Sequence, residues 1–205
     1  MTKISKSASA LIIVVLIVSF FLPCKNLAAA EETSSEKEKK PWLIETGFST
    51  GFNKGRMKGD NEYQSMVFSV LFGFDLKPLL KKVHIGFPGK FQFNFAPFLN
   101  PIIAPENNVE FGFDLNYKYS FPLFEKLWPY IEVGNGFIYS TQETPEQSTQ
   151  WNFLSQGGGG FSFFIKKDVS LNASYRYRHY SNAGAKEPNR GIDSSMYMVG
   201  ISFHR

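Results

Sequence analysis

The chain of 205 residues has a single cysteine and, after residue 30, no long apolar run. Cys24 lies in an N-terminal segment that we expect to be removed, so the mature chain has no thiol for a disulfide or a thiolate metal site. A helix that spans a membrane needs about 20 consecutive apolar residues. No segment beyond residue 30 supplies them, which excludes a helical membrane domain there.

A marked excess of one charge sign is also missing from the mature chain. The first thirty residues combine Lys3 and Lys6, an apolar run over 10–22 and the small residues 28–30. This pattern predicts a signal peptide over residues 1–30, with an uncleaved anchor as the alternative. The whole chain has 22 basic and 18 acidic residues, and three of the lysines lie in this segment. The remaining charge is nearly balanced and gives no support for nucleic-acid binding.

Aromatic residues are abundant, at 17% of the chain. Residues 31–41 are polar and predict a flexible tail, and residues 42–205 form one predicted domain. In that domain, segments of about ten residues alternate apolar and polar side chains between turn-rich stretches, which is typical of a membrane β-barrel. The eight predicted strands cover residues 42–53, 62–76, 90–99, 109–121, 128–141, 150–165, 169–181 and 193–203.

The alternation gives each predicted strand one apolar and one polar face. Phe91, Phe93 and Phe95 share a face, against Gln92 and Asn94. In a narrow barrel the polar faces can pair in the interior while aromatic residues face lipid. A soluble sandwich would also alternate, but the signal peptide, the aromatic content and the terminal strand ending near Phe203 favour an eight-stranded antiparallel outer-membrane barrel. The charged residues on the polar faces are Glu45, Asp75, Lys90, Asp114, Lys118, Arg176 and Arg178.

Four consecutive glycines, Gly157–Gly160, lie inside the sixth predicted strand. No Lys-Ser or Lys-Thr pair follows them and no helical pattern begins there, so they do not form a phosphate-binding loop. Glycine within a strand instead indicates a close approach of neighbouring groups.

One group of residues in the sequence suggests chemistry. His179 and Ser181 are two positions apart on a predicted strand, so their side chains lie on the same face. If residues 182–190 form the turn, a symmetric hairpin places Asp193 opposite His179 and Gly191 opposite Ser181. In a catalytic triad a hydroxyl is the nucleophile, an imidazole is the general base and a carboxylate orients the imidazole. Ser181, His179 and Asp193 could supply these three groups.

The parity of these positions places them on the outer, lipid-facing side of the barrel. His179 and Ser181 alternate in step with the apolar positions of their strand, and Asp193 does so with those of the last strand. Polar side chains facing lipid are costly unless they serve a function. The alternative is an ordinary histidine and serine at a strand end in the headgroup zone.

The stretch from His179 to Gly184, HYSNAG, followed by Pro188-Asn189 and Gly191, resembles the lipid A 3-O-deacylase (PagL) family of Gram-negative outer membranes. The resemblance is specific over residues 177–193 and diffuse over the rest of 42–205. It implies an eight-stranded barrel with a Ser-His-Glu triad on its lipid-facing surface. It also implies hydrolysis of the ester that holds the 3-hydroxyacyl chain at position 3 of lipid A.

Carried over residue by residue, the resemblance implies Ser181 as the nucleophile and His179 as the general base. The acid falls at Asp193, where the family usually has Glu, and Glu187 is a second candidate for that role. The sequence also matches family positions near the oxyanion at Asn182, Gly184 and Asn189.

This resemblance implies a serine esterase that needs no metal or organic cofactor. Its implied partner is lipid A or lipopolysaccharide of the outer leaflet. Two alternatives stay open: a non-enzymatic structural or adhesion barrel, and a phospholipid esterase with the same site. Whether the barrel works alone or as a homodimer is also open.

Overall fold

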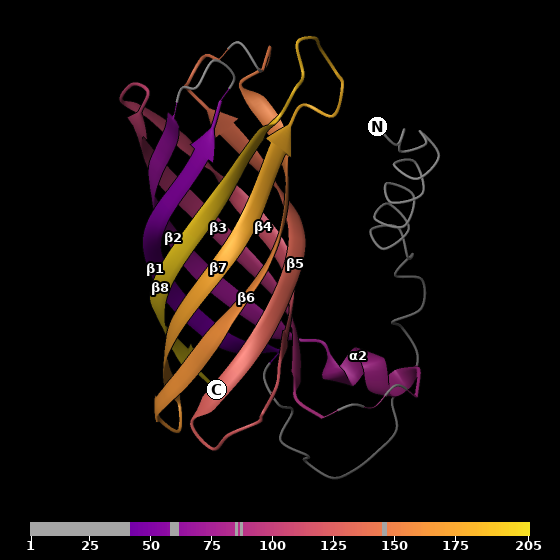
Figure 1. The fold of residues 1–205 in the computed structure, drawn as a ribbon. Coiled ribbons are helices and arrows are strands. Elements are labelled where there is room, and N and C mark those ends of the chain that lie inside the picture. Colours follow the sequence, from indigo (N-terminus) through magenta and orange to yellow (C-terminus); the bar gives the residue numbers. More distant parts are fainter. Residues whose placement is uncertain (1–41, 58–61, 85, 87, 145–146) are drawn as a thin grey trace, which may run out of the picture. The chain divides into compact units, whose positions relative to one another are not determined.

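The computed structural model describes residues 42–57, 62–84, 86, 88–144 and 147–205. The predicted signal peptide (1–30) and polar tail (31–41) lie outside the described residues. Within the described part, eight antiparallel strands close into a barrel (Figure 1). The strands are β1 (Leu43–Arg56), β2 (Glu62–Asp75), β3 (Lys90–Ala104), β4 (Asn108–Ser120), β5 (Leu127–Ser140), β6 (Trp151–Lys166), β7 (Val169–Ser181) and β8 (Ile192–His204).

Each strand pairs with the next along the chain, and β8 pairs with β1 to close the sheet. Closure leaves no strand edge with unpaired backbone groups, which a barrel in a membrane requires. The predicted fold class is therefore confirmed, and the observed strands begin and end within a few residues of the predicted ones. The predicted bounds of β7 match the observed ones.

The two faces of the barrel wall differ as the alternation predicts. Gln92 and Asn94 are buried in the interior. The alternating phenylalanines Phe91, Phe93 and Phe95 are turned outward and only partly covered by neighbours. Aromatic pairs extend across the outer surface from strand to strand, such as Phe113 with Phe137 and Phe137 with Phe153. The outer surface is thus a nearly continuous apolar layer.

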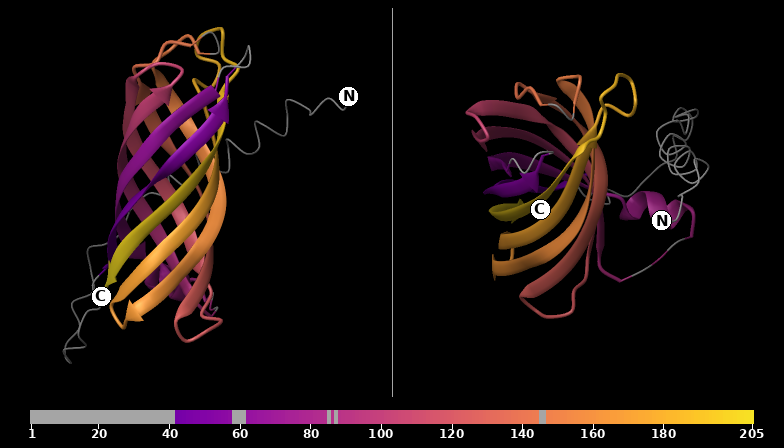
Figure 2. Two further views of the ribbon diagram at one scale, coloured as in Figure 1. Left: turned by 60° about the vertical axis from the view of Figure 1, so that its left-hand side comes forward. Right: turned by 45° about the horizontal axis from the view of Figure 1, so that its top comes forward.

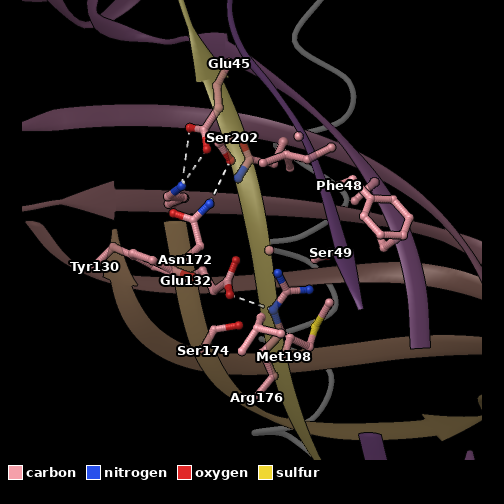
Figure 3. Close-up of a pocket in the computed structure, with 18 residues that line it drawn as sticks. Glu45, Phe48, Ser49, Tyr130, Glu132, Asn172, Ser174, Arg176, Met198 and Ser202 are labelled. Atoms are coloured by element: carbon pink, nitrogen blue, oxygen red, sulfur yellow. Dashed lines mark hydrogen bonds and ion pairs between the residues drawn. The ribbon is translucent and has the colours of Figure 1, made fainter. Parts of the chain in front are cut away.

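Ion pairs and hydrogen bonds fill the interior. Arg176 donates to Glu132 at 2.6 Å, and Lys118 contacts Glu45 at 3.2 Å (Figure 3). Nearer the β7–β8 loop, Arg178 Nη2 donates to Glu110 at 2.6 Å. The buried charges are therefore paired, as a low-dielectric interior demands, and the predicted pairing of inward charges is confirmed for these residues.

An apolar cluster closes the interior at the end of the barrel near the β7–β8 loop. Its members are buried side chains from six strands and one adjoining residue: Met57, Tyr63, Phe98, Ile102, Ile138, Leu154, Tyr180 and Ile192. The interior is thus a packed core there and not an open channel.

The glycine run lies in the middle of β6, as predicted. Gly158 and Gly160 face the interior, and a Cβ on Gly160 would lie 2.8 Å from the Tyr130 ring. The inward glycines therefore leave space for a large aromatic side chain inside a narrow barrel.

The connections lie at two ends. The β7–β8 loop lies at the end of the barrel opposite the C-terminus, and helix α2 (Lys77–Lys82) in the β2–β3 connection lies at the C-terminal end (Figures 1 and 2). Across the described residues, no helix has the length and apolar character needed to cross a membrane.

Candidate active site

The structure brings His179, Ser181 and Asp193 to one place on the outer surface of the barrel. His179 and Ser181 lie near the C-terminal end of β7, and Asp193 is the second residue of β8. The side chains of His179 and Asp193 keep 41% and 57% of their surface exposed. Tyr180, which follows His179, and Ile192, which precedes Asp193, are buried inside the barrel. His179 and Asp193 therefore point away from the barrel interior.

The strand register places Asp193 directly opposite His179, as the symmetric hairpin predicts. Their side chains meet: His179 Nδ1 lies 2.8 Å from Asp193 Oδ1. An ionised carboxylate can only accept, so in a neutral imidazole this contact places the proton on Nδ1 and leaves the lone pair on Nε2. The imidazole is thereby held in the tautomer that a general base needs.

The wall behind this pair is closely packed and hydrogen-bonded. Arg178, which precedes His179, is buried and bound to Glu110, and Tyr180, which follows it, packs edge-to-face against Tyr63. These contacts fix the backbone on both sides of the histidine. A side chain on such a support keeps its geometry better than one on a free loop.

Gly191 lies against the histidine ring, one residue before β8 begins. A Cβ on this residue would lie 2.9 Å from His179 Nε2 and closer still to Cε1. Its φ of +73° is also a conformation that favours glycine. The missing side chain of Gly191, the residue predicted opposite Ser181, gives room to the imidazole.

Ser181 is half-buried on the same outer face, opposite Phe153 of β6. In the part of the chain that the structure describes, its hydroxyl makes no hydrogen bond to His179. Catalytic hydrogen bonds of this kind are often long before substrate binds. A second outward serine, Ser155, pairs with His179 across β6 and β7, but its hydroxyl donates to Asn135 at 2.9 Å.

The three residues predicted near the oxyanion form one hydrogen-bonded loop. The Asn189 side-chain oxygen accepts from the Asn182 backbone N–H at 2.9 Å, and the Asn182 side-chain oxygen accepts from the Gly184 N–H at 3.0 Å. Asn182 is buried and its amide also donates to Lys186 O at 2.7 Å. The structure therefore gives Asn182 and Gly184 a role in shaping the loop, because their groups already have partners.

The other acid candidate lies apart from the histidine. Glu187 is in the loop, where its carboxylate accepts from the Asn189 backbone N–H at 3.0 Å. Asp193 is therefore the carboxylate that the structure places on His179.

The remaining histidines differ from each other. His84 is exposed, whereas His204 lies inside the barrel with its Nε2 2.8 Å from Ser170 Oγ and its Nδ1 3.2 Å from Lys90 Nζ. The residues that His204 contacts are distant from it in the sequence. Its even-numbered position in β8 points it inward, which was the available signal.

The family follows from comparison of the sequence with protein-family models. The model described as lipid A 3-O-deacylase (PagL) matches residues 26–202. The chain belongs to the lipid A 3-O-deacylase family. The match spans both the barrel and the segment with His179, Ser181 and Asp193. Members of this family are outer-membrane proteins, and this chain is accordingly an outer-membrane protein of a Gram-negative bacterium.

Solved structures support the same fold for this family member. The crystal structure of the outer-membrane enzyme PagL superposes with a TM-score of 0.53 at 18% identity, covering 76% of this chain and 97% of that one. Neisserial surface protein A superposes with a TM-score of 0.59 at 12% identity, covering 79% and 97%. At these identities the likeness shows the barrel fold alone. Comparison with curated protein sequences gives no significant match.

Proposed function

We propose that this protein is a lipid A 3-O-deacylase whose Ser181, His179 and Asp193 form the catalytic triad. Its reaction is hydrolysis of the ester that links a 3-hydroxyacyl chain to position 3 of lipid A. The observation that carries the assignment is the 2.8 Å contact between His179 Nδ1 and Asp193 Oδ1 on the outer surface of an outer-membrane barrel. Family membership supplies the substrate.

The position of the triad explains how substrate reaches it. The outer surface of a membrane barrel faces hydrocarbon and headgroups, so a lipid can approach His179 by lateral diffusion in the leaflet. No passage through the interior is needed, and the ion pairs inside leave no such path near the apolar cluster. All three residues come from two adjacent strands of one chain, so the site requires no second copy.

The reaction takes place in two steps. His179 Nε2 accepts the proton of the Ser181 hydroxyl as its oxygen attacks the ester carbonyl. The sugar hydroxyl leaves with a proton returned by His179, and the acyl group stays on Ser181. Water, activated by His179, then releases the 3-hydroxy fatty acid and restores the serine. Asp193 stabilises the imidazolium that forms in each step.

Asn189 is the side chain that we assign to the developing oxyanion. Its Oδ1 is bound to the Asn182 N–H, so its Nδ2 is directed to the other side of the carboxamide. A preorganised amide donor of this kind stabilises the tetrahedral intermediate. Asn182 and Gly184 act through the loop, by holding Asn189 in place.

The decisive test is mass spectrometry of lipid A from Gram-negative cells that express this chain or a variant. We expect the wild type to remove one 3-hydroxyacyl group and the Ser181→Ala variant to remove none. Ser155→Ala is the matched control, because it deletes another outward hydroxyl beside His179 and should leave activity intact. Heat-modifiable migration in a gel verifies that each variant is folded.

Each other result would identify a different function. Activity retained in Ser181→Ala and lost in Ser155→Ala would move the nucleophile to β6. Fatty-acid release from phospholipids in place of lipid A would keep the site and change the substrate. A folded wild-type barrel that leaves every lipid intact would favour a structural or adhesion role.

A further inference from the structure

Helix α2 has an apolar stripe that the described part of the protein leaves largely uncovered. Leu76, Leu79, Leu80 and Val83 recur at the spacing that aligns side chains on one face of a helix. Leu79 and Val83 are 43% and 62% exposed, and no residue within the helix is buried. A helix of a soluble domain turns such a stripe toward a core, so the stripe of α2 requires a different apolar environment.

The opposite face of α2 is basic. It carries Lys77, Lys81 and Lys82, and the whole connection over residues 76–89 contains no acidic residue. An amphipathic helix with one apolar and one lysine-rich face is typical of segments that lie in the interface of a membrane that contains anionic lipids. The charge of α2 is therefore complementary to a surface of lipid phosphates.

Two hydrogen bonds attach the start of the helix to the barrel wall. The Leu76 N–H donates to Phe91 O at 3.0 Å, and the Asp75 carboxylate accepts from the Lys77 N–H at 2.9 Å. Pro78 in the first turn supports a helix start at this point. From there α2 extends away from the barrel and does not cross its mouth (Figures 1 and 2). The helix therefore lies on the side of the wall that lipid surrounds.

The two ends of the barrel indicate which leaflet α2 meets. The proposed active site lies at the end with the β7–β8 loop, and its substrate, lipid A, is in the outer leaflet. At the other end, the connections over residues 121–126 and 167–168 are short, as periplasmic turns of outer-membrane barrels usually are. Helix α2 lies at this second end, so it meets the inner leaflet, which consists of phospholipids.

We propose that α2 is an interfacial anchor that binds the anionic phospholipid surface of the inner leaflet. Leu79 and Val83 enter the boundary between headgroups and acyl chains, and the lysines contact the phosphates. This is a second lipid contact of the protein, at the end opposite the candidate active site. The choice of leaflet rests on the proposed function, whereas the binding of anionic phospholipid by α2 does not.

The test is fluorescence quenching of the expected mature chain, residues 31–205, inserted into vesicles of phosphatidylcholine and phosphatidylglycerol. That chain has no cysteine, so Val83→Cys supplies a single thiol for an environment-sensitive fluorophore. We expect this label to emit at shorter wavelength, and to be quenched more strongly by a nitroxide on the lipid acyl chain, than the same label in Lys81→Cys. Lys81 is the matched control because it lies on the opposite face of the same helix.

A second comparison tests the lysines. A lysine near an anionic membrane surface favours binding about fivefold, so Lys81→Gln with Lys82→Gln should lower the ratio of docked to free helix about 25-fold. This appears as loss of quenching of the Val83→Cys label. The matched control is Lys166→Gln with Lys167→Gln, an adjacent pair of exposed lysines at the same end of the barrel, and should leave the quenching unchanged.

Three results would overturn the inference. Equal quenching of the labels at positions 83 and 81 would show that the helix does not dock by its apolar stripe. Equal quenching in vesicles with and without phosphatidylglycerol would exclude recognition of anionic lipid. A label at position 83 that is shielded from water but not quenched by the lipid nitroxide would mean that protein covers the stripe, either the N-terminal tail or a second copy of the chain.

These vesicles contain no lipid A, so failure of the anchor and failure of the proposed function are distinguishable. Loss of docking leaves the deacylation experiment unaffected. A docked helix in a protein that leaves lipid A intact would overturn the proposed function, and with it the choice of leaflet, but not the binding of anionic phospholipid.

Discussion

Two groups made of a serine, a histidine and a carboxylate lie on opposite faces of the barrel wall. The outer group is Ser181, His179 and Asp193. The inner group is Ser170, His204 and Glu45, in which His204 Nε2 lies 2.8 Å from Ser170 Oγ and His204 Nδ1 lies 3.9 Å from Glu45 Oε2. By the serine–histidine distance alone, the inner group is the better triad.

The inner group nevertheless lacks what catalysis needs. Ser170 is fully buried, so no ester can reach its hydroxyl. Glu45 accepts hydrogen bonds from Lys118 (Figure 3) and from Gln92 at 2.9 Å, so its charge is already paired. In the outer group, Asp193 is bound to His179 and both remain accessible. Access and an acid bound to the histidine therefore distinguish the proposed site from an interior network with the same residue types.

The strongest way to break this comparison is to remove each histidine in turn. We expect His179→Ala to lower the rate of lipid A deacylation about a thousandfold, because it deletes the general base. His204→Ala should leave the rate within about twofold and lower only the stability of the barrel, because it deletes hydrogen bonds of the interior. The measurement is kcat/KM in mixed micelles, with thermal unfolding followed on the same samples. Comparable losses of rate in both variants would show that the distinction drawn above is wrong.

A smaller loss of deacylation activity should follow from a substitution that displaces the His179 imidazole without removing it. A Cβ at Gly191 would overlap the His179 ring, so we expect Gly191→Ala to displace the imidazole and lower activity about a hundredfold. Gly89 is a control with matching strain, since it also has a positive φ and also has no room for a Cβ, but lies beside Ser120 at the other end of the barrel. Gly89→Ala should lose stability and keep its activity per folded molecule. Equal loss of activity per folded molecule in the two variants would mean that backbone strain, and not the imidazole, accounts for the effect.

The smallest expected effect is a loss of stability when the serine of the inner group is replaced. Ser170→Ala removes the hydroxyl that contacts His204, and we expect the free energy of unfolding to fall by about 1 kcal/mol, the usual net value of one hydrogen bond. Deacylation should be unchanged. Urea unfolding in detergent micelles gives the first quantity, and lipid A mass spectra give the second. Loss of deacylation in this variant would assign the inner group a role in the chemistry.

Much of the outer group could be predicted because it depends on local rules. The alternation in β7 fixes which side His179 and Ser181 face, and a hairpin turn over 182–190 fixes Asp193 as the partner of His179. Both depend on residues within one hairpin. The family resemblance adds the ester and the sugar position, which strand geometry does not contain.

The parts that could not be predicted depend on contacts between distant strands. The approach of His204 to Glu45 occurs across the seam where the last strand meets the first. Asn182 also donates to Ser148 of another loop, at 3.3 Å. The contact of Gly191 with the imidazole depends on a backbone angle that the sequence signals only as glycine. None of these is set by periodicity.

The seam has a consequence for how the protein is made. Strand β8 carries Asp193 on its β7 side and completes the barrel by pairing with β1 on the other. Asp193 therefore reaches His179 through the same strand that closes the barrel. A chain in which this strand is not yet paired would therefore lack the proposed acid beside His179. If the proposed triad carries the reaction, the onset of lipid A deacylation in a refolding sample reports the pairing of β8 with β7.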